Sequence, residues 1–384
     1  RRRAERAHVL PYGRQWVDES DIDAVAAVLR GDWLTTGPAV DTFEAALAEV
    51  TGSTLPAVSV TSGTAALHVA YAALGVGPGD TVVTTPLTFV ATASTASILG
   101  ATLVFADVSE DTGNLDPDAV DAVLDEKVRV VAGVDFGGHP IDAPALRAVA
   151  GTVGAVVLED AAHALGGSLD GIPVGSLSDV TTLSFFPTKN ITTAEGGAVV
   201  SADAELLARA RTFRTIGLVR DPDQLRHPEL GPWHQEVQAF GLNYRLPDVL
   251  AALGASQLRR LDAFRVRRQE LHDRYTAALA EVPELRTPTR RPGAEPCWHL
   301  YPVRVLDGRR RELFEHLREH EVGVQVNYLP VYWHPVYADL GYRRGLCPVA
   351  EEYAAQELSL PLFPALADAD ADRVIDLVRS FFGA

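Results

Sequence analysis

Lysine is scarce in this sequence of 384 residues. Lysine and arginine together number 34, and two of these residues, Lys127 and Lys189, are lysines. An arginine side chain stays protonated in proteins and does not serve as a nucleophilic amine. Any chemistry that needs an imine between the protein and an aldehyde therefore has two candidate positions.

Cysteine, long apolar runs and positive charge are also lacking. Cys297 and Cys347 are too few for a disulfide framework or a cysteine-rich zinc site. No run of about 18 apolar residues and no signal-peptide pattern is present, so we expect a cytoplasmic protein without a membrane partner. The formal net charge of -17 argues against a nucleic-acid partner, because phosphate recognition needs a basic surface. The short run Arg1-Arg2-Arg3 is interpreted as a solvated tail.

Short apolar runs alternate with helix-like segments from about residue 57 to residue 213. This alternation predicts an α/β fold with a mostly parallel sheet that is covered by helices on both faces. Helices are expected to begin near Thr64, Val90, Asp116, Ala143 and Asp203. The expected strands are Ala57 to Val60, Thr81 to Thr84, Thr102 to Phe105, Val128 to Val134, Ala155 to Leu158, Thr181 to Phe185 and Ala198 to Val200.

The length of the chain favours one large and one smaller domain. A long charged helix is expected from Ala251 to Val282, followed by a proline-rich stretch at 287–296 and a new βα pattern from His299. We therefore predict a large domain at residues 1–250, which includes the N-terminal segment. The long connecting helix and a smaller α/β domain would occupy residues 251–384.

The two lysines differ in their surroundings. Lys127 lies within Asp125 to Arg129, a charged junction where a solvated surface lysine is the expected role. Lys189 lies in the hydroxyl-rich segment from Ser184 to Thr193, directly after an apolar strand. A desolvated lysine at that place would have the lowered pKa that imine formation requires. Taken alone, however, a loop lysine is more often structural.

Two further segments carry polar side chains at the ends of expected strands. Asp160 comes at the carboxyl end of a buried strand, where open α/β sheets bind ligands, and His163 follows it. A carboxylate there can keep a pyridine nitrogen protonated, although an acidic helix cap explains Asp160 as well. Gly63 and Thr64 begin an alanine-rich helix after a strand, an arrangement that binds phosphate but also fits an ordinary N-cap.

With these segments in order, the sequence resembles the DegT-type family of sugar aminotransferases, which have the type I fold of pyridoxal 5'-phosphate (PLP) enzymes. The likeness extends over nearly the whole chain and is closest to the C4 aminotransferases of the pseudaminic acid type. The segments that carry this closer likeness are Tyr12 to Gln15, Asp32 to Pro38, Thr192 to Gly197, Phe213 to Asp221 and Gln325 to Pro335.

The resemblance implies roles for individual residues around PLP in the large domain. Lys189 would form the Schiff base, Asp160 would pair with the pyridinium nitrogen, and His163, a glutamine in many relatives, would lie beside the phenolic oxygen. Phe89 would stack on the ring. The cofactor phosphate would be bound by Gly63, Thr64, Ser184 and, from the neighbouring subunit of a homodimer, Asn243. The sugar nucleotide would face Thr36, Tyr328 and His334.

The resemblance also implies a reaction, the transfer of an amino group from glutamate to the 4-keto carbon of a nucleotide-linked 4-keto-6-deoxy (N-acetyl)hexose. Pro187 to Asn190 departs from the His-Pro-Val-Lys-Thr run of the subgroup, and Asn327 stands where a histidine is common. Both departures bear on the substrate, so amination of a 3-keto sugar linked to dTDP or of a cyclitol ketone stays open. A non-catalytic paralogue that binds sugar nucleotides is a further alternative. A sugar dehydratase is disfavoured, because such relatives carry a histidine in place of Lys189.

Overall fold

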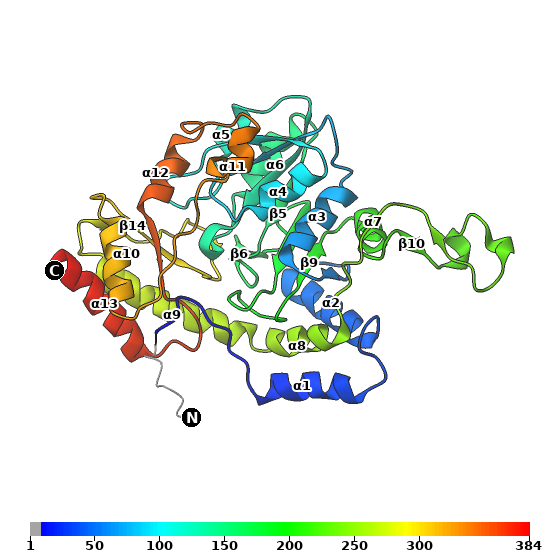
Figure 1. Ribbon diagram of the computed structural model, residues 1–384, viewed down its shortest axis with the longest axis horizontal. Helices are drawn as coiled ribbons and strands as arrows, with labels where there is room; N and C mark the ends of the chain where they lie inside the picture. Colours follow the sequence, from blue (N-terminus) through cyan, green and yellow to red (C-terminus); the bar gives the residue numbers. More distant parts are fainter. Residues whose placement is uncertain (1–8) are drawn as a thin grey trace.

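A seven-stranded sheet forms the centre of the structure, a computed structural model that describes residues 9–384 (Figure 1). The strand order is β1-β9-β8-β5-β4-β2-β3, and β9 runs antiparallel to both of its neighbours. The expected α/β fold with a mostly parallel sheet is thus confirmed, whereas the run Arg1-Arg2-Arg3 lies outside the described residues. The strands are β1 (Val58–Val60), β2 (Thr81–Thr84), β3 (Thr102–Phe105), β4 (Val128–Val134), β5 (Val156–Asp160), β8 (Val180–Ser184) and β9 (Gly197–Val200).

Helices cover both faces of this sheet, because successive residues of a strand point to opposite sides. Val82 and Val130 pack into one apolar core, whereas their neighbours Val83 and Val131 pack into another. The first core is covered by α3 (Gly63–Ala73), α4 (Ala91–Ile98) and α7 (Ala204–Arg214), and the second by α2 (Pro38–Thr51), α5 (Pro117–Asp121), α6 (Ala143–Gly151) and α8 (Asp248–Leu258). α1 (Glu19–Arg30) packs against α8.

The single long helix expected from Ala251 to Val282 is wrong. The chain forms α8 and α9 (Leu261–Leu279), with a turn between them in which Arg260 has a φ of -109° and a ψ of 3°. The Arg260 guanidinium pairs with Asp18 at 2.8 Å and also with Asp21, both from the N-terminal segment. Because these contacts join positions far apart in the chain, a periodic sequence pattern could not show the break.

A third apolar core lies in the C-terminal part of the chain. It is built from α9, β12 (Leu285–Arg286), β14 (Tyr301–Val305), α10 (Arg310–Glu319), β15 (Glu357–Leu360) and α13 (Asp368–Phe382), with β14 antiparallel to both other strands. α11 (Pro335–Asp339) and α12 (Pro348–Gln356) return to the large sheet, where Tyr337 and Tyr353 join the first core. The division at residue 250 therefore stays a prediction.

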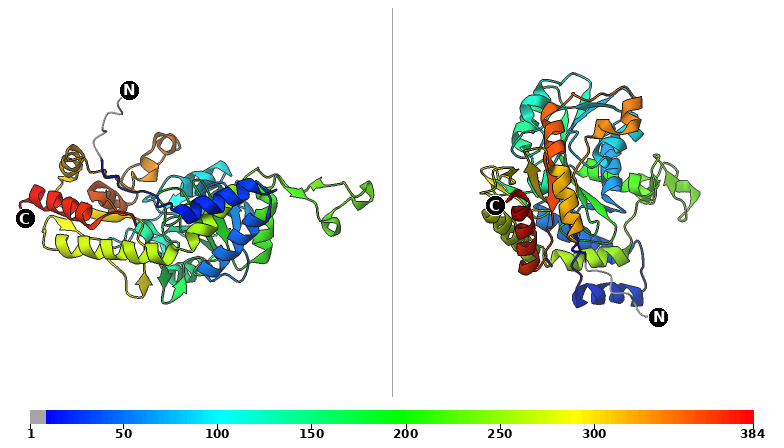
Figure 2. Two further views of the ribbon diagram at one scale, coloured as in Figure 1. Left: turned by 90° about the horizontal axis from the view of Figure 1, so that it is seen from below. Right: turned by 60° about the vertical axis from the view of Figure 1, so that its left-hand side comes forward.

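Residues 218–242 form an arm that stands off the body in all three views (Figures 1 and 2). Its short hairpin pairs β10 (Leu218–Val219) with β11 (Glu236–Val237). Trp233 and Phe240 of this arm are 80% and 99% exposed. A second small sheet joins β6 (Ser168–Leu169), β7 (Ile172–Pro173) and β13 (Ala294–Glu295). No helix within residues 9–384 has the length and apolar character needed to cross a membrane.

A buried ion pair fixes α2 against the sheet and α7. Glu44 is 3% exposed, and its Oε1 atom accepts hydrogen bonds from the N–H of Ser59 at 2.9 Å and from its hydroxyl at 2.7 Å. Arg214 pairs with the same oxygen and donates to the Ser59 carbonyl at 2.6 Å. Removing Glu44 would take the carboxylate acceptor away from the Arg214 guanidinium and from the N–H and hydroxyl of Ser59.

We expect Glu44→Ala to lower the free energy of unfolding by about 3 kcal/mol, since breaking a buried ion pair leaves an uncompensated charge. Glu49→Ala, at an exposed position of the same helix, is the matched control and should change it by less than about 0.5 kcal/mol. Chemical denaturation measures both variants. Equal losses would show that the ion pair contributes nothing beyond helix propensity.

Candidate active site

A cavity of about 410 Å³ lies at the carboxyl edge of the large sheet. β4, β5 and β8 end at this edge, and the first turn of α3 borders it. Parallel strands bring the residues that follow them to one edge, which explains why segments far apart in the sequence meet here. The predicted site residues in its lining are Gly63, Thr64, Phe89, Asp160, His163, Ser184, Lys189 and Tyr328.

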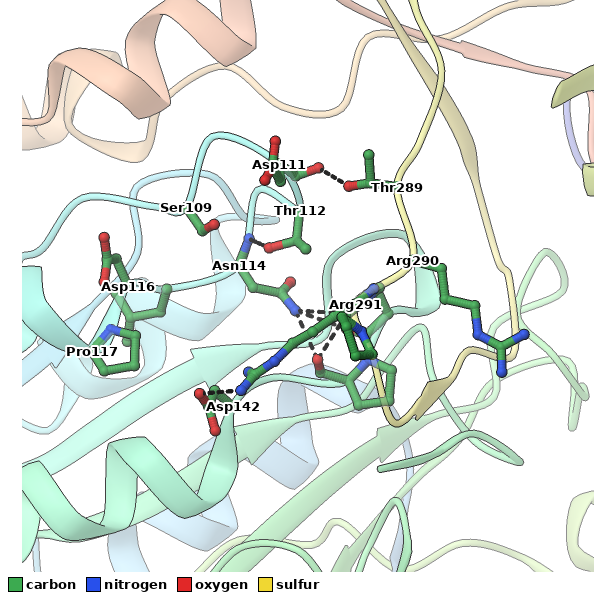
Figure 3. Close-up of a pocket in the computed structure, with 14 residues that line it drawn as sticks. Ser109, Asp111, Thr112, Asn114, Asp116, Pro117, Asp142, Thr289, Arg290 and Arg291 are labelled. Atoms are coloured by element: carbon green, nitrogen blue, oxygen red, sulfur yellow. Dashed lines mark hydrogen bonds and ion pairs between the residues drawn. The ribbon is translucent and has the colours of Figure 1, made fainter. Parts of the chain in front are cut away.

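Another cavity, of about 350 Å³, lies between the loop at 109–117 and the proline-rich connector (Figure 3). Arg291 pairs there with Asp142 at 2.5 Å, and its backbone N–H donates to His139 at 3.0 Å. Asn114 donates to the carbonyl of His139 at 2.9 Å. These polar groups form hydrogen bonds and an ion pair with one another, so we interpret this cavity as a structural contact between the loop and the proline-rich connector. We place the chemistry in the cavity of about 410 Å³.

Lys189 lies in the turn after β8, where its backbone N–H donates to the carbonyl of Phe186 at 2.9 Å. Burial of the amine lowers the pKa of Lys189 to about 8, and the nearby carboxylate of Asp160 limits that decrease. Desolvation penalises the ammonium form, so a large share of the amine is neutral slightly above neutral pH. Lys189 thus has the property that a nucleophilic amine needs.

Asp160 ends β5 and is 6% exposed. Its Oδ2 atom accepts a hydrogen bond from the Thr92 hydroxyl at 2.7 Å, and its Oδ1 atom accepts one from the Ala162 N–H at 3.2 Å. Burial raises the pKa of Asp160, while these two hydrogen bonds and the charge of Lys189 oppose the increase. The carboxylate can therefore stabilise a cation placed in the cavity.

His163 lies beside Tyr328 and His299. The Tyr328 hydroxyl is 3.2 Å from His163 Nε2, and the rings of His163 and His299 have centroids 4.4 Å apart. Burial and the positive charge of Lys189 keep the pKa of both histidines well below the usual range, so both are neutral. Among the described residues His163 Nδ1 has no partner, which leaves it available to a ligand.

The first turn of α3 forms a cradle next to Ser184. Ser62 is the N-cap and accepts a hydrogen bond from the Ala65 N–H at 3.1 Å. An ordinary N-cap, one of the two interpretations that the sequence allowed for this turn, is therefore present. A Cβ atom added to Gly63 would lie 2.7 Å from the Cβ of Ser184. Glycine therefore lets the helix N-terminus and a serine hydroxyl approach one point, an arrangement suited to an anion such as phosphate.

Three predicted residues are absent from the lining of this cavity within residues 9–384. Thr36 is exposed, and its hydroxyl donates to the carbonyl of Thr35 at 2.7 Å. Asn243 forms an antiparallel bridge with Thr215, and His334 precedes α11. Their roles stay predictions.

The lining also contains residues that the sequence did not single out, including Tyr12, Glu195 and His299. Tyr12 and Glu195 lie within segments that carried the resemblance, so those segments were the available signal. His299 had no such signal. It enters the site because its N–H donates to the Gly137 carbonyl at 2.8 Å, a contact between distant parts of the chain.

Residues 15–379 match the DegT/DnrJ/EryC1/StrS aminotransferase family. The chain belongs to this family. It is 40% identical to the spore coat polysaccharide biosynthesis protein SpsC of Bacillus subtilis, with 98% of this chain and 97% of that protein covered. It is 36% identical to the UDP-4-amino-4,6-dideoxy-N-acetyl-beta-L-altrosamine transaminase of Campylobacter jejuni, with 97% of both chains covered.

A solved structure extends this comparison. Helicobacter pylori PseC, an aminotransferase involved in the biosynthesis of pseudoaminic acid, is 29% identical and has a TM-score of 0.91. The match covers 97% of this chain and 99% of that one. The chain is accordingly a PLP-dependent sugar aminotransferase of the DegT family, and the expected type I fold is confirmed.

The residues of the cavity fit PLP. A buried lysine of lowered pKa, a buried carboxylate, an unpartnered imidazole nitrogen and an anion cradle match its aldehyde, ring nitrogen, phenolic oxygen and phosphate. Lys189, Asp160, His163 and the cradle of Gly63 and Ser184 would hold those four groups in turn. When bound, PLP supplies an electrophilic carbon and a ring that takes up an electron pair.

The lowered pKa of Lys189 can be measured directly in the protein without cofactor. In a Lys127→Arg variant labelled with ¹³C at the lysine side chain, the one remaining lysine signal belongs to Lys189. We expect this signal to titrate with a midpoint of about 8, because burial disfavours the ammonium form. A midpoint near 10.4, the value of a solvated lysine, would contradict the proposed desolvation.

Proposed function

We propose that this DegT-family enzyme transfers an amino group from glutamate to the 4-keto carbon of a nucleotide-linked 4-keto-6-deoxy (N-acetyl)hexose. The observation that carries the amine transfer is the burial of Lys189 together with Asp160 in one cavity. The choice of sugar rests on the Campylobacter transaminase, whose name states a UDP-4-amino-4,6-dideoxy sugar and which matches nearly the whole chain.

The residues of this chain divide the chemistry between them. The Asp160 carboxylate would keep a bound pyridine nitrogen protonated, since an anion nearby favours the cationic form. The neutral amine of Lys189 would take the α-proton of glutamate and later return a proton to the sugar carbon, acting as general base and then as general acid. Two substrates would therefore use one site in turn, which gives ping-pong kinetics.

Aromatic side chains around the cavity would bind the planar and apolar parts of the ligands. The Phe89 ring is 57% exposed, and its centroid lies 6.2 Å from that of Tyr328, with the planes at 61°. An exposed ring at the wall of a cavity is available to stack on a cofactor ring. Tyr328, Thr36 and His334 remain our proposed contacts of the sugar nucleotide.

We further propose that the working unit is a homodimer with shared active sites. Trp233 and Phe240 of the arm at 218–242 are largely exposed, and aromatic side chains are enriched at protein–protein interfaces. Asn243 directly follows the arm and lies outside the cavity of its own chain, so Asn243 of the partner subunit would reach the cofactor phosphate. A cytoplasmic location, without nucleic-acid or membrane partners, is part of the same proposal.

The first half of the reaction can be followed without knowing the sugar. We expect L-glutamate to bleach the absorbance band of the PLP-loaded enzyme and to release 2-oxoglutarate in an amount equal to the active sites. Lys189→Ala should lose this conversion by about 10² to 10⁴-fold or more, because the amine moves the proton. Lys127→Ala is the matched control and should react like the wild type. Retained conversion in Lys189→Ala would refute the assignment.

The shared site can be tested by mixing inactive subunits. In the proposed homodimer, each site takes Lys189 from one chain and Asn243 from the other. A dimer of one Lys189→Ala chain and one Asn243→Ala chain therefore has one site that lacks both residues and one site in which both residues are intact. We expect activity of the mixture to exceed that of either variant alone. Lys189→Ala mixed with Asp160→Ala is the control, since both residues belong to one chain and no intact site can form. Equal behaviour of the two mixtures would contradict the shared site.

Competition between substrates tests which carbon of the sugar accepts the amino group. A 4-keto-6-deoxy sugar linked to UDP should accept the amine at least about tenfold faster than a 3-keto sugar linked to dTDP or a cyclitol ketone, since specificity differences in a shaped pocket reach this size. Faster amination of a 3-keto sugar or a cyclitol ketone would leave the amine transfer intact and replace the proposed substrate.

A further inference from the structure

Glu159 is a buried carboxyl group that the reaction leaves without a role. It precedes Asp160 on β5, so the two side chains point to opposite faces of the sheet. Glu159 is fully buried, and its Oε2 atom accepts a hydrogen bond from the Thr181 hydroxyl at 2.8 Å. A charged carboxylate in such a place needs compensation.

Asp135 follows β4 and is also fully buried. Its Oδ1 atom accepts a hydrogen bond from the Ile141 N–H at 2.8 Å, and its own N–H donates to the carbonyl of Asp160 at 3.1 Å. β4 and β5 pair in parallel with Gly133 opposite Glu159, so Glu159 and Asp135, two residues beyond Gly133, lie on the same face of the sheet. The two carboxyl groups are neighbours, and each affects the pKa of the other. Because two carboxylates both lack a donor, a hydrogen bond between them requires a proton on one of them.

One oxygen of each carboxyl group is left without a donor. Among the described residues, Asp135 Oδ2 and Glu159 Oε1 are buried and have no N–H or O–H donor. Unpaired buried acceptors are rare, because each loses its hydration without replacement. One proton between these two atoms would satisfy both of them at once.

We propose that Asp135 and Glu159 share one proton between Oδ2 and Oε1, and that this proton leaves Asp160 as the ionised carboxyl group that faces the cofactor. Asp135 and Glu159 are thus positioning residues, which act through Asp160. This role rests on the proposed pairing of Asp160 with the cofactor and does not depend on the identity of the sugar.

The competition for protons among the three carboxyl groups supports this assignment. Three adjacent buried carboxylates would repel one another, so at least one takes up a proton. Asp160 has the Thr92 hydroxyl and the positive charge of Lys189 to stabilise its anion. Asp160 is the titratable group whose charge acts on the pair, from the opposite face of the sheet. The groups that donate hydrogen bonds to the pair belong to Thr181, Ile141 and Gly175 and do not titrate. Burial raises the pKa of both members of the pair.

Infrared spectroscopy of the protein without cofactor detects the proton directly. At pH 6 we expect a C=O stretch of a protonated carboxyl group that shifts in D₂O and is missing in Glu159→Gln. The glutamine amide can donate to Asp135, which then remains ionised. Glu357, whose pKa burial raises to about 8, adds a second protonated group, so the difference between wild type and variant is the measured quantity. Glu126→Gln, at an exposed position, is the matched control and should show no such difference.

A second readout separates positioning from mere packing. We expect the affinity of wild-type protein for PLP to rise as the pH rises and the shared proton is lost, because the added negative charge favours the pyridinium cation. Glu159→Gln should lack this component of the pH dependence. Titration of Lys189 affects both proteins equally and cancels in the comparison. If Glu159→Gln fails to fold, Asp135→Asn serves in its place. An infrared spectrum identical in wild type and Glu159→Gln, or identical pH dependence of PLP affinity, would overturn the proposal.

Discussion

The amine of Lys189 must be neutral for part of the time near neutral pH, and its burial makes this possible. A solvated lysine would stay protonated, whereas desolvation lowers the pKa of Lys189 to about 8. The same burial requires a nearby anion, since an isolated ammonium group in the cavity would be strongly destabilised. Asp160 provides this anion, and the folding of the sheet brings the two side chains to one cavity.

The alternation of side chains along β5 has consequences on both sides of the sheet. Asp160 points into the cavity, while Glu159 points to the other face and meets Asp135. In our proposal, one short strand thus carries both the carboxylate that would pair with the cofactor and the carboxyl group that keeps this carboxylate ionised. Asp135 also binds the main chain of Asp160, so the end of β4 holds the end of β5 in place.

Much of this arrangement follows from the sequence. Apolar runs separated by helical segments predicted all seven strands of the large sheet to within about two residues. Lysine is scarce and Lys127 lies in a charged junction, so residue type and local context made Lys189 the candidate amine, and the resemblance to the family supplied its predicted role. These signals are local, because strand periodicity and residue type are properties of short segments.

Other features depend on contacts between distant residues and left no local signal. The expected helix is interrupted at Arg260, which pairs with Asp18 and Asp21 more than 200 positions earlier. His299 enters the site through a hydrogen bond to Gly137, and Glu159 finds Asp135 only after β4 and β5 pair. Hydrophobic periodicity reports which face of an element is buried, but not which polar groups meet across the fold.

We propose above that Lys189 is the residue that binds the cofactor covalently. The most direct test is to load the enzyme with PLP, reduce it with borohydride, digest it and locate the modified lysine by mass spectrometry. Our account predicts the pyridoxyl group on the peptide that contains Lys189, with the Lys127 peptide unmodified. Modification of Lys127, or of neither lysine, would contradict it.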